Sequence, residues 1–148
     1  MRVSLDQKLS PDEAEAIARG LYAIANRDGL HEREAMLIAS FWADSGGGPV
    51  ALAELGRQPI ITADQLARAL HDDDTRRLFL QTAVLLAWAD GNASAGEMAL
   101  IGEFAGALGV APAEVAIIDG EVKEYLLSHL THLQNSASAA NVAKKMGV

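Results

Sequence analysis

Cysteine is absent from the 148 residues of this chain, which excludes both a disulfide framework and a thiolate metal site. Aromatic residues make up only 5% of the chain, and no uninterrupted apolar run reaches the roughly 18 residues that span a membrane. Basic residues are also few, with 12 Lys and Arg against 20 Asp and Glu. The resulting net charge of −8 argues against nucleic acid and anionic membranes as partners, and it favours cations or a basic protein surface.

Hydrophobic residues form half of the chain, and alanine is abundant among them. This composition favours closely packed helices, and the length suits a single domain. We therefore expect an all-α protein, a compact bundle of about six to eight helices over residues 1–148, with its core at about 10–133. Residues 135–148 are expected to form a tail or a last helix. The first ten residues lack the apolar core of a secretion signal, so a cytoplasmic protein is expected.

Capping motifs predict where several helices begin. Ser10 to Glu13 forms a capping box with proline at the first helical position, and Thr62 to Gln65 and Ser94 to Glu97 repeat the box. Apolar spacing then predicts helices over residues 11–26, 32–43, 50–56, 62–70, 78–89 and 113–133, together with a helix that follows the Ser94 cap and ends before Gly109. The helix over 78–89 is apolar on nearly every side, which predicts a central position. Asp119-Gly120 is expected to kink the last of these helices or to divide it in two.

Two stretches of the chain repeat one helix-turn-helix pattern. The clearer copy occupies residues 85–109, and a weaker copy occupies residues 23–43. Asp28-Gly29 aligns with Asp90-Gly91, and after one extra residue in the later turn Glu34 aligns with Glu97. The apolar residues that follow each glutamate also align. The sequence therefore predicts an internal pseudo-repeat.

The aligned acids of these turns are the candidate functional residues. Asp90 stands where a helix ends, opposite the negative end of the helix dipole, so its charge needs a cation, an arginine or amide donors. Glu97 follows the inward stripe of its helix together with Ile101, Phe104 and Leu108, and Glu34 does the same in the first copy. Each copy is thus expected to direct an acid toward the protein interior.

Ordinary structural roles compete with this interpretation. Glu97 completes a capping box, and Asp-Gly is a common turn dipeptide. In the first copy His31 stands where a Ser or Thr would cap the helix, so capping explains Glu34 less well. The alternate oxygens of Asp90, Asn92 and Ser94 resemble the start of a calcium loop, but the sequence then departs from the EF-hand pattern.

Two further groups of polar residues are assigned to structural roles. The run Asp72-Asp73-Asp74 precedes a predicted helix, where acids serve as caps and dipole partners, and Arg76 and Arg77 are expected to neutralise it. His129 and His132 have metal-binding spacing without a matching carboxylate, so they are expected to be solvated or interfacial.

The second copy resembles the TerB family, named for a tellurite-resistance protein and also found as the amino-terminal domain of some membrane-anchored DnaJ-like co-chaperones. The motif A-x-A-D-G-x-h-S-x-x-E stands at residues 87–97, with a looser version at residues 25–34, and the resemblance covers roughly residues 11–133. It implies a compact helical fold with a pseudo-repeat and an acidic cluster that holds a divalent metal. It also implies a role in stress or tellurite resistance.

Three hypotheses follow. The first is a non-enzymatic TerB-like scaffold whose two turns share a divalent cation, with the candidate ligands Asp28, Glu34, Asp90, Glu97, Asn92 and His31. Oxygen ligands suit Ca²⁺, Mg²⁺ or Mn²⁺, and His31 would admit zinc or iron. The second is a metal-free protein-interaction module. The third, a metal-dependent hydrolase, is disfavoured because no nucleophile-base set or phosphate-binding loop is found. The expected partner is an unidentified protein, without nucleic acid or direct membrane insertion, and a homodimer is compatible with the sequence.

Overall fold

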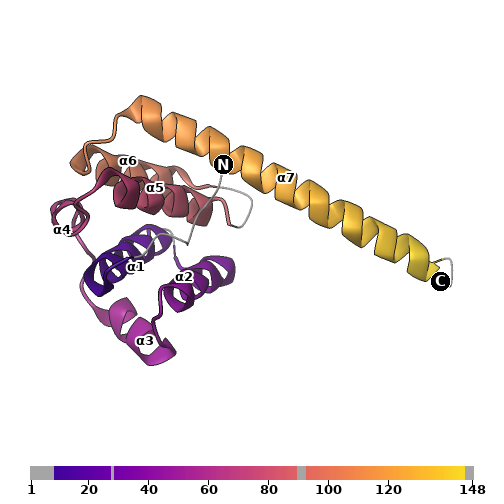
Figure 1. Ribbon diagram of the computed structural model, residues 1–148, viewed down its shortest axis with the longest axis horizontal. Coiled ribbons are helices and arrows are strands. Elements are labelled where there is room, and N and C mark those ends of the chain that lie inside the picture. The colour runs from indigo at the N-terminus through magenta and orange to yellow at the C-terminus, as the bar shows by residue number, and fades with distance from the viewer. Residues whose placement is uncertain (1–8, 28, 90–92, 146–148) are drawn as a thin grey trace.

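The computed structural model describes residues 9–27, 29–89 and 93–145 of the chain. Within these ranges it contains seven α-helices and no strand (Figure 1). The helices are α1 (Pro11–Ala25), α2 (Glu32–Asp44), α3 (Pro49–Arg57), α4 (Ala63–Ala69), α5 (Asp73–Ala87), α6 (Ala95–Ala107) and α7 (Pro112–Lys145). The all-α bundle that the sequence predicts is confirmed.

Two helical hairpins form the centre of the bundle. Helices α1 and α2 pack against each other, as do α5 and α6, and the two hairpins meet along α1 and α5. In addition, α1 contacts α6, and α2 contacts α5. Helices α2 and α6 do not contact each other. Exchanging α1 with α5 and α2 with α6 leaves this contact pattern unchanged. The repeated sequence therefore folds as two hairpins related by a pseudo-twofold.

Three of the predicted capping boxes are present at helix starts. The Glu13 amide donates to Ser10 Oγ at 3.1 Å, and the Ser10 amide donates to Glu13 Oε1 at 2.9 Å. Thr62 and Gln65 make the same reciprocal pair at the start of α4. The third box lies at the start of α6 and belongs to the candidate site. These local bonds explain why the starts of α1, α4 and α6 were predictable from sequence.

The core is built mainly on α1 and α5. Helix α5 contacts α1, α2, α6 and α7, as its apolar surface predicts. Phe79 of α5 meets Phe104 of α6 edge to face, with 5.7 Å between ring centroids. On its other side Phe79 packs against Gly20 of α1, where an added Cβ would lie 2.6 Å from the ring. The absence of a side chain at Gly20 therefore lets the two hairpins approach closely.

Asp119-Gly120 does not interrupt the last helix, so the predicted kink is wrong. Helix α7 continues from Pro112 to Lys145, and it includes residues 135–145 that the sequence left as a tail or a last helix. A glycine inside a helix costs only about 1 kcal/mol relative to alanine. Burial of Ile118 and Val122 against the bundle on either side of this dipeptide outweighs that cost.

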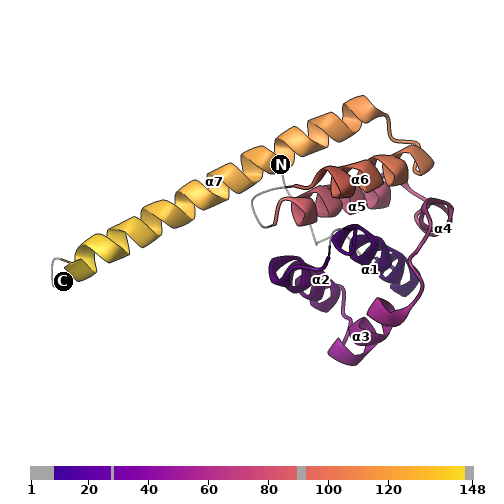
Figure 2. The same cartoon turned by 180° about the vertical axis from the view of Figure 1, so that it is seen from behind.

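The distal part of α7 extends away from the other helices in both views (Figures 1 and 2). Of the remaining described helices, α7 contacts α5 and α6. Among the described residues, no helix combines the length and the apolar character that a membrane span requires.

Candidate functional site

Two glutamates lie inside the bundle at equivalent places in the two hairpins. Glu34, in the first turn of α2, is 2% exposed, and Glu97, in the first turn of α6, is 5% exposed. They are the only buried carboxylates among the described residues. The apolar residues that share their helix faces are buried too, namely Ile38, Phe41, Ile101, Phe104 and Leu108. The prediction that each copy directs an acid inward is confirmed.

Each buried glutamate also caps its own helix. The His31 amide donates to Glu34 Oε1 at 3.1 Å, and the Ser94 amide donates to Glu97 Oε1 at 3.4 Å. Ser94 Oγ in turn accepts the Glu97 amide at 3.0 Å. We expected capping to explain Glu34 less well than Glu97. That expectation is wrong, because the Glu34 carboxylate accepts the backbone N–H at the cap position of its helix. That half of the box needs only a backbone N–H at the cap position, which histidine supplies as well as serine does.

The second oxygen of Glu97 is the unusual atom of the site. Glu97 Oε2 is buried and has no hydrogen-bond partner among the described residues. A buried polar atom without a partner costs free energy, and a buried charge costs more. A counter-charge, a proton or a donor from outside the described residues would offset this cost. Asp90, Gly91 and Asn92, which precede Glu97 in the sequence, lie outside the described residues.

Of the four other predicted ligands, His31 is the one that lies among the described residues. Asp28, Asp90 and Asn92 lie outside the described residues, and His31 is exposed at the start of α2. No three His, Asp or Glu side chains of the described residues are grouped so that they could hold a metal ion. Glu34 and Glu97 belong to α2 and α6, which do not contact each other directly. A cation site shared by both turns therefore stays a prediction.

A polar link that the sequence analysis missed joins the end of α5 to α7, just before the second acidic turn. Trp88 Nε1 donates to Asp119 Oδ1 at 2.9 Å, and Lys123 Nζ lies 2.9 Å from Asp119 Oδ2. The same ammonium group lies 4.9 Å from the centre of the Trp88 ring. Only the spacing of Asp119 and Lys123, four residues apart, hinted at this link. These contacts fix the chain two residues before Asp90.

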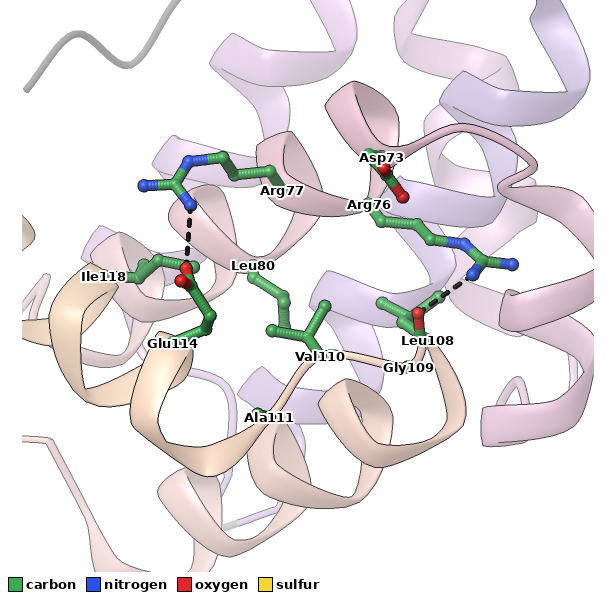
Figure 3. A pocket seen from close by; sticks show the side chains of 10 residues that line it. All are labelled: Asp73, Arg76, Arg77, Leu80, Leu108, Gly109, Val110, Ala111, Glu114 and Ile118. Atoms are coloured by element: carbon green, nitrogen blue, oxygen red, sulfur yellow. Dashed lines mark hydrogen bonds and ion pairs between the residues drawn. The ribbon is translucent and has the colours of Figure 1, made fainter.

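A cleft of about 400 Å³ lies at the opposite end of the α5–α6 hairpin, between the start of α5, the end of α6 and the start of α7 (Figure 3). Its arginines do not neutralise the Asp72–Asp74 run, so that expectation is wrong. Arg76 donates to the carbonyl oxygens of Ala67, Leu70 and Leu108 at 2.7–3.1 Å. Arg77 pairs with Glu114 and Glu121, both at 3.2 Å. The arginines of this cleft serve to join helices.

Comparison with known proteins gave one match. The family model described as tellurite resistance protein TerB matches residues 50–123, which is half of the chain. The matched part runs from α3 into α7 and includes the second acidic turn and Glu97, whereas the first hairpin precedes it. No curated protein and no solved structure matched the chain.

Proposed function

This chain belongs to the TerB family, and from that premise we propose that it is a non-enzymatic module that binds a divalent cation at its buried helix-start glutamates. The observation that carries the proposal is Glu97 Oε2, a buried carboxylate oxygen without a hydrogen-bond partner among the described residues. A bound cation would supply the missing counter-charge.

The chemistry of the neighbouring residues suits a hard cation. Asp90 and Asn92 precede Glu97 closely in the sequence, and their carboxylate and amide oxygens are of the kind that binds Ca²⁺, Mg²⁺ or Mn²⁺. The first hairpin offers Asp28 and Glu34 at the matching positions, and participation of His31 would extend the choice to zinc or iron. The chain itself contributes a carboxylate that is already positioned, because its capping bond holds Oε1 on the Ser94 amide.

Calorimetric titration of the chelator-treated protein with Ca²⁺, Mg²⁺ and Mn²⁺ tests the proposal. We expect saturable heat for at least one ion and a strong loss of affinity in Glu97→Gln, which keeps an oxygen for the cap but removes the charge. Glu103→Gln is the matched control, since Glu103 lies on the same helix and is exposed. Absence of heat for all three ions, or equal binding by Glu97→Gln and wild type, would overturn the proposal.

A metal-free interaction module is the second candidate, and the capping bonds of both glutamates favour it. In that case Glu97→Ala, which removes the capping bond, costs about 1 kcal/mol of stability, a typical capping contribution, and added ions leave the melting temperature unchanged. Thermal melts of wild type and variant, with and without ions, separate the two candidates. A scaffold role in stress or tellurite resistance is compatible with either, and its support is the family alone.

A further inference from the structure

The cleft between the start of α5, the α6–α7 connection and the start of α7 is large enough for a small molecule. Its volume of about 400 Å³ falls within the range of roughly 300–1,000 Å³ that is typical of ligand sites. The base of the cleft is apolar and consists of Leu80, Leu108, Val110 and Ile118. Three of these residues are buried, and Val110 is half-buried. Such a base suits a ligand with an apolar body.

Both arginines that line the cleft are already engaged by the protein. Each of the three side-chain nitrogens of Arg76 donates to a carbonyl oxygen near the end of α4 or α6, and helix ends of this kind carry partial negative charge. Arg77 pairs with the carboxylates of Glu114 and Glu121. The two guanidinium charges are therefore compensated within the chain, which disfavours an anionic ligand.

The carboxylate of Asp73, in contrast, has no counter-charge among the described residues. It lines the cleft and forms neither an ion pair nor a hydrogen bond with them. Glu114 pairs with Arg77 through one oxygen, Oε2. Figure 3 shows Asp73 and Glu114 on different sides of the cleft, with the side chains of Leu80 and Val110 between them. The cleft therefore combines an apolar base with negative charge at its rim.

We propose that this cleft binds an organic ammonium group attached to a small apolar body, with the ammonium at Asp73 and the body on Leu80 and Val110. A divalent metal ion suits the cleft poorly, because no three His, Asp or Glu side chains of the described residues are grouped to hold one. The net charge of −8 attracts organic cations toward the chain. Free amines and the lysine side chain of a partner protein share this chemistry. The inference does not depend on cation binding at Glu97.

Titration of the ¹⁵N-labelled full-length protein, followed by two-dimensional NMR, tests the proposal. For phenethylamine we expect saturable shifts of the Val110 and Ala111 amide signals, with a Kd on the order of 1 mM for so small a ligand. Phenethyl alcohol has the same ring without the charge and should bind about two- to fivefold more weakly, the range that one exposed ion pair supplies. The anion 3-phenylpropionate should cause no saturable shift there. Equal binding of the three compounds would overturn the proposal.

Neighbouring aspartates of α5 provide a matched pair of variants. Asp73→Asn should weaken phenethylamine binding about two- to fivefold and leave the affinity for phenethyl alcohol unchanged. Asp74→Asn is the control, since Asp74 is also exposed in the first turn of α5 but does not line the cleft. It should bind phenethylamine as wild type does. Equal weakening by both variants would contradict a contact at Asp73.

A lysine with both backbone ends capped, with and without acetylation of its side chain, distinguishes the two sources of the ammonium group. Tighter binding of the capped lysine than of phenethylamine, lost on acetylation, would indicate a lysine of a partner protein. Tighter binding of phenethylamine would indicate a free amine. Either result, if it depends on Asp73, supports the proposal. If neither compound causes shifts at Val110 and Ala111 that weaken in Asp73→Asn, the cleft is not an ammonium site.

Discussion

Asp72 shows how one side chain at a helix start links stability to pH. Its Oδ1 accepts the Thr75 hydroxyl at 2.6 Å and the Thr75 amide at 2.7 Å. These bonds, the hydroxyl first, lower the pKa of Asp72 below its ordinary value of 3.8. Because the pKa is lower in the folded state, the stabilisation is present above the ordinary pKa and is lost as the pH falls through the folded value.

The variant Asp72→Asn keeps an oxygen for the cap but cannot titrate. Wild type should therefore melt at a higher temperature than Asp72→Asn near pH 6, and the difference should shrink to nothing as the pH falls well below 3.8. Melting temperatures by circular dichroism between pH 2 and 7 measure this. Asp64→Asn, at an exposed position in the first turn of α4, controls for loss of surface charge. A difference that is independent of pH would contradict the assignment.

Gly20 leaves no room for a larger side chain, since an added Cβ would lie 2.6 Å from Phe79 Cε1. Gly20→Ala should destabilise the protein by about 1–3 kcal/mol, the usual cost of overpacking a well-filled core. Gly102 is a helical glycine with open space around its Cβ position, so Gly102→Ala should stabilise the protein by about 0.5–1 kcal/mol. Urea unfolding of the two variants should therefore give changes of opposite sign.

Residue-scale prediction from sequence succeeded where the interaction is local. The capping boxes at Ser10, Thr62 and Ser94 depend on residues three apart, and all three are present. The inward placement of Glu34 and Glu97 followed from helical periodicity in the same way. The contacts of Arg76 depend on where the ends of α4 and α6 lie in space, and sequence spacing carries no information about that.

At the scale of elements, Arg76 joins the ends of two helices to the start of a third. Its guanidinium donates to carbonyl oxygens at the ends of α4 and α6, where the helix dipoles favour positive charge. Arg76→Met should therefore lower the free energy of unfolding by about 2–4 kcal/mol, because several carbonyl groups lose a charged donor.

Arg77 is the matched control for this prediction. It is the next residue of α5, and its side chain is 42% exposed in ion pairs with Glu114 and Glu121. Exposed pairs of this kind contribute at most about 1 kcal/mol, so Arg77→Met should cost much less than Arg76→Met. Chemical denaturation of both variants measures the difference. Equal losses would mean that the carbonyl contacts of Arg76 add little.

Element boundaries were predictable where local chemistry sets them and were not where packing overrides it. The predicted helices over residues 11–26 and 32–43 agree within one residue with α1 and α2. Helix α7 was predicted with a break at Asp119-Gly120, because propensity alone disfavours glycine there. Its continuity depends on burial against α5 and α6, together with the contacts of Asp119 to Trp88 and Lys123.

At the scale of the whole molecule, the two hairpins share one core although the family match covers only residues 50–123. The buried cluster includes Ile17, Leu21 and Ile24 of α1 together with Phe79, Leu80 and Val84 of α5. Without the first hairpin, the face of α5 that packs on α1 and α2 would be exposed to water. The sequence therefore contains two copies of the repeat, but the two copies fold together around one core.

A fragment of residues 50–148 should consequently fail to form a fixed tertiary structure. We expect it to keep helical far-ultraviolet circular dichroism but to show poor chemical-shift dispersion in NMR and to bind a hydrophobic dye, because the exposed surface of α5 is apolar. A second fragment, residues 9–128, keeps both hairpins and loses only the distal part of α7. It should melt within a few degrees of the full chain, since Ile118 and Val122, which anchor α7 in the core cluster, and Leu126, which packs against it, are all retained. Cooperative melting of the 50–148 fragment with native-like NMR dispersion would contradict a shared core. It would mean that the part matched by the family model folds without the first hairpin.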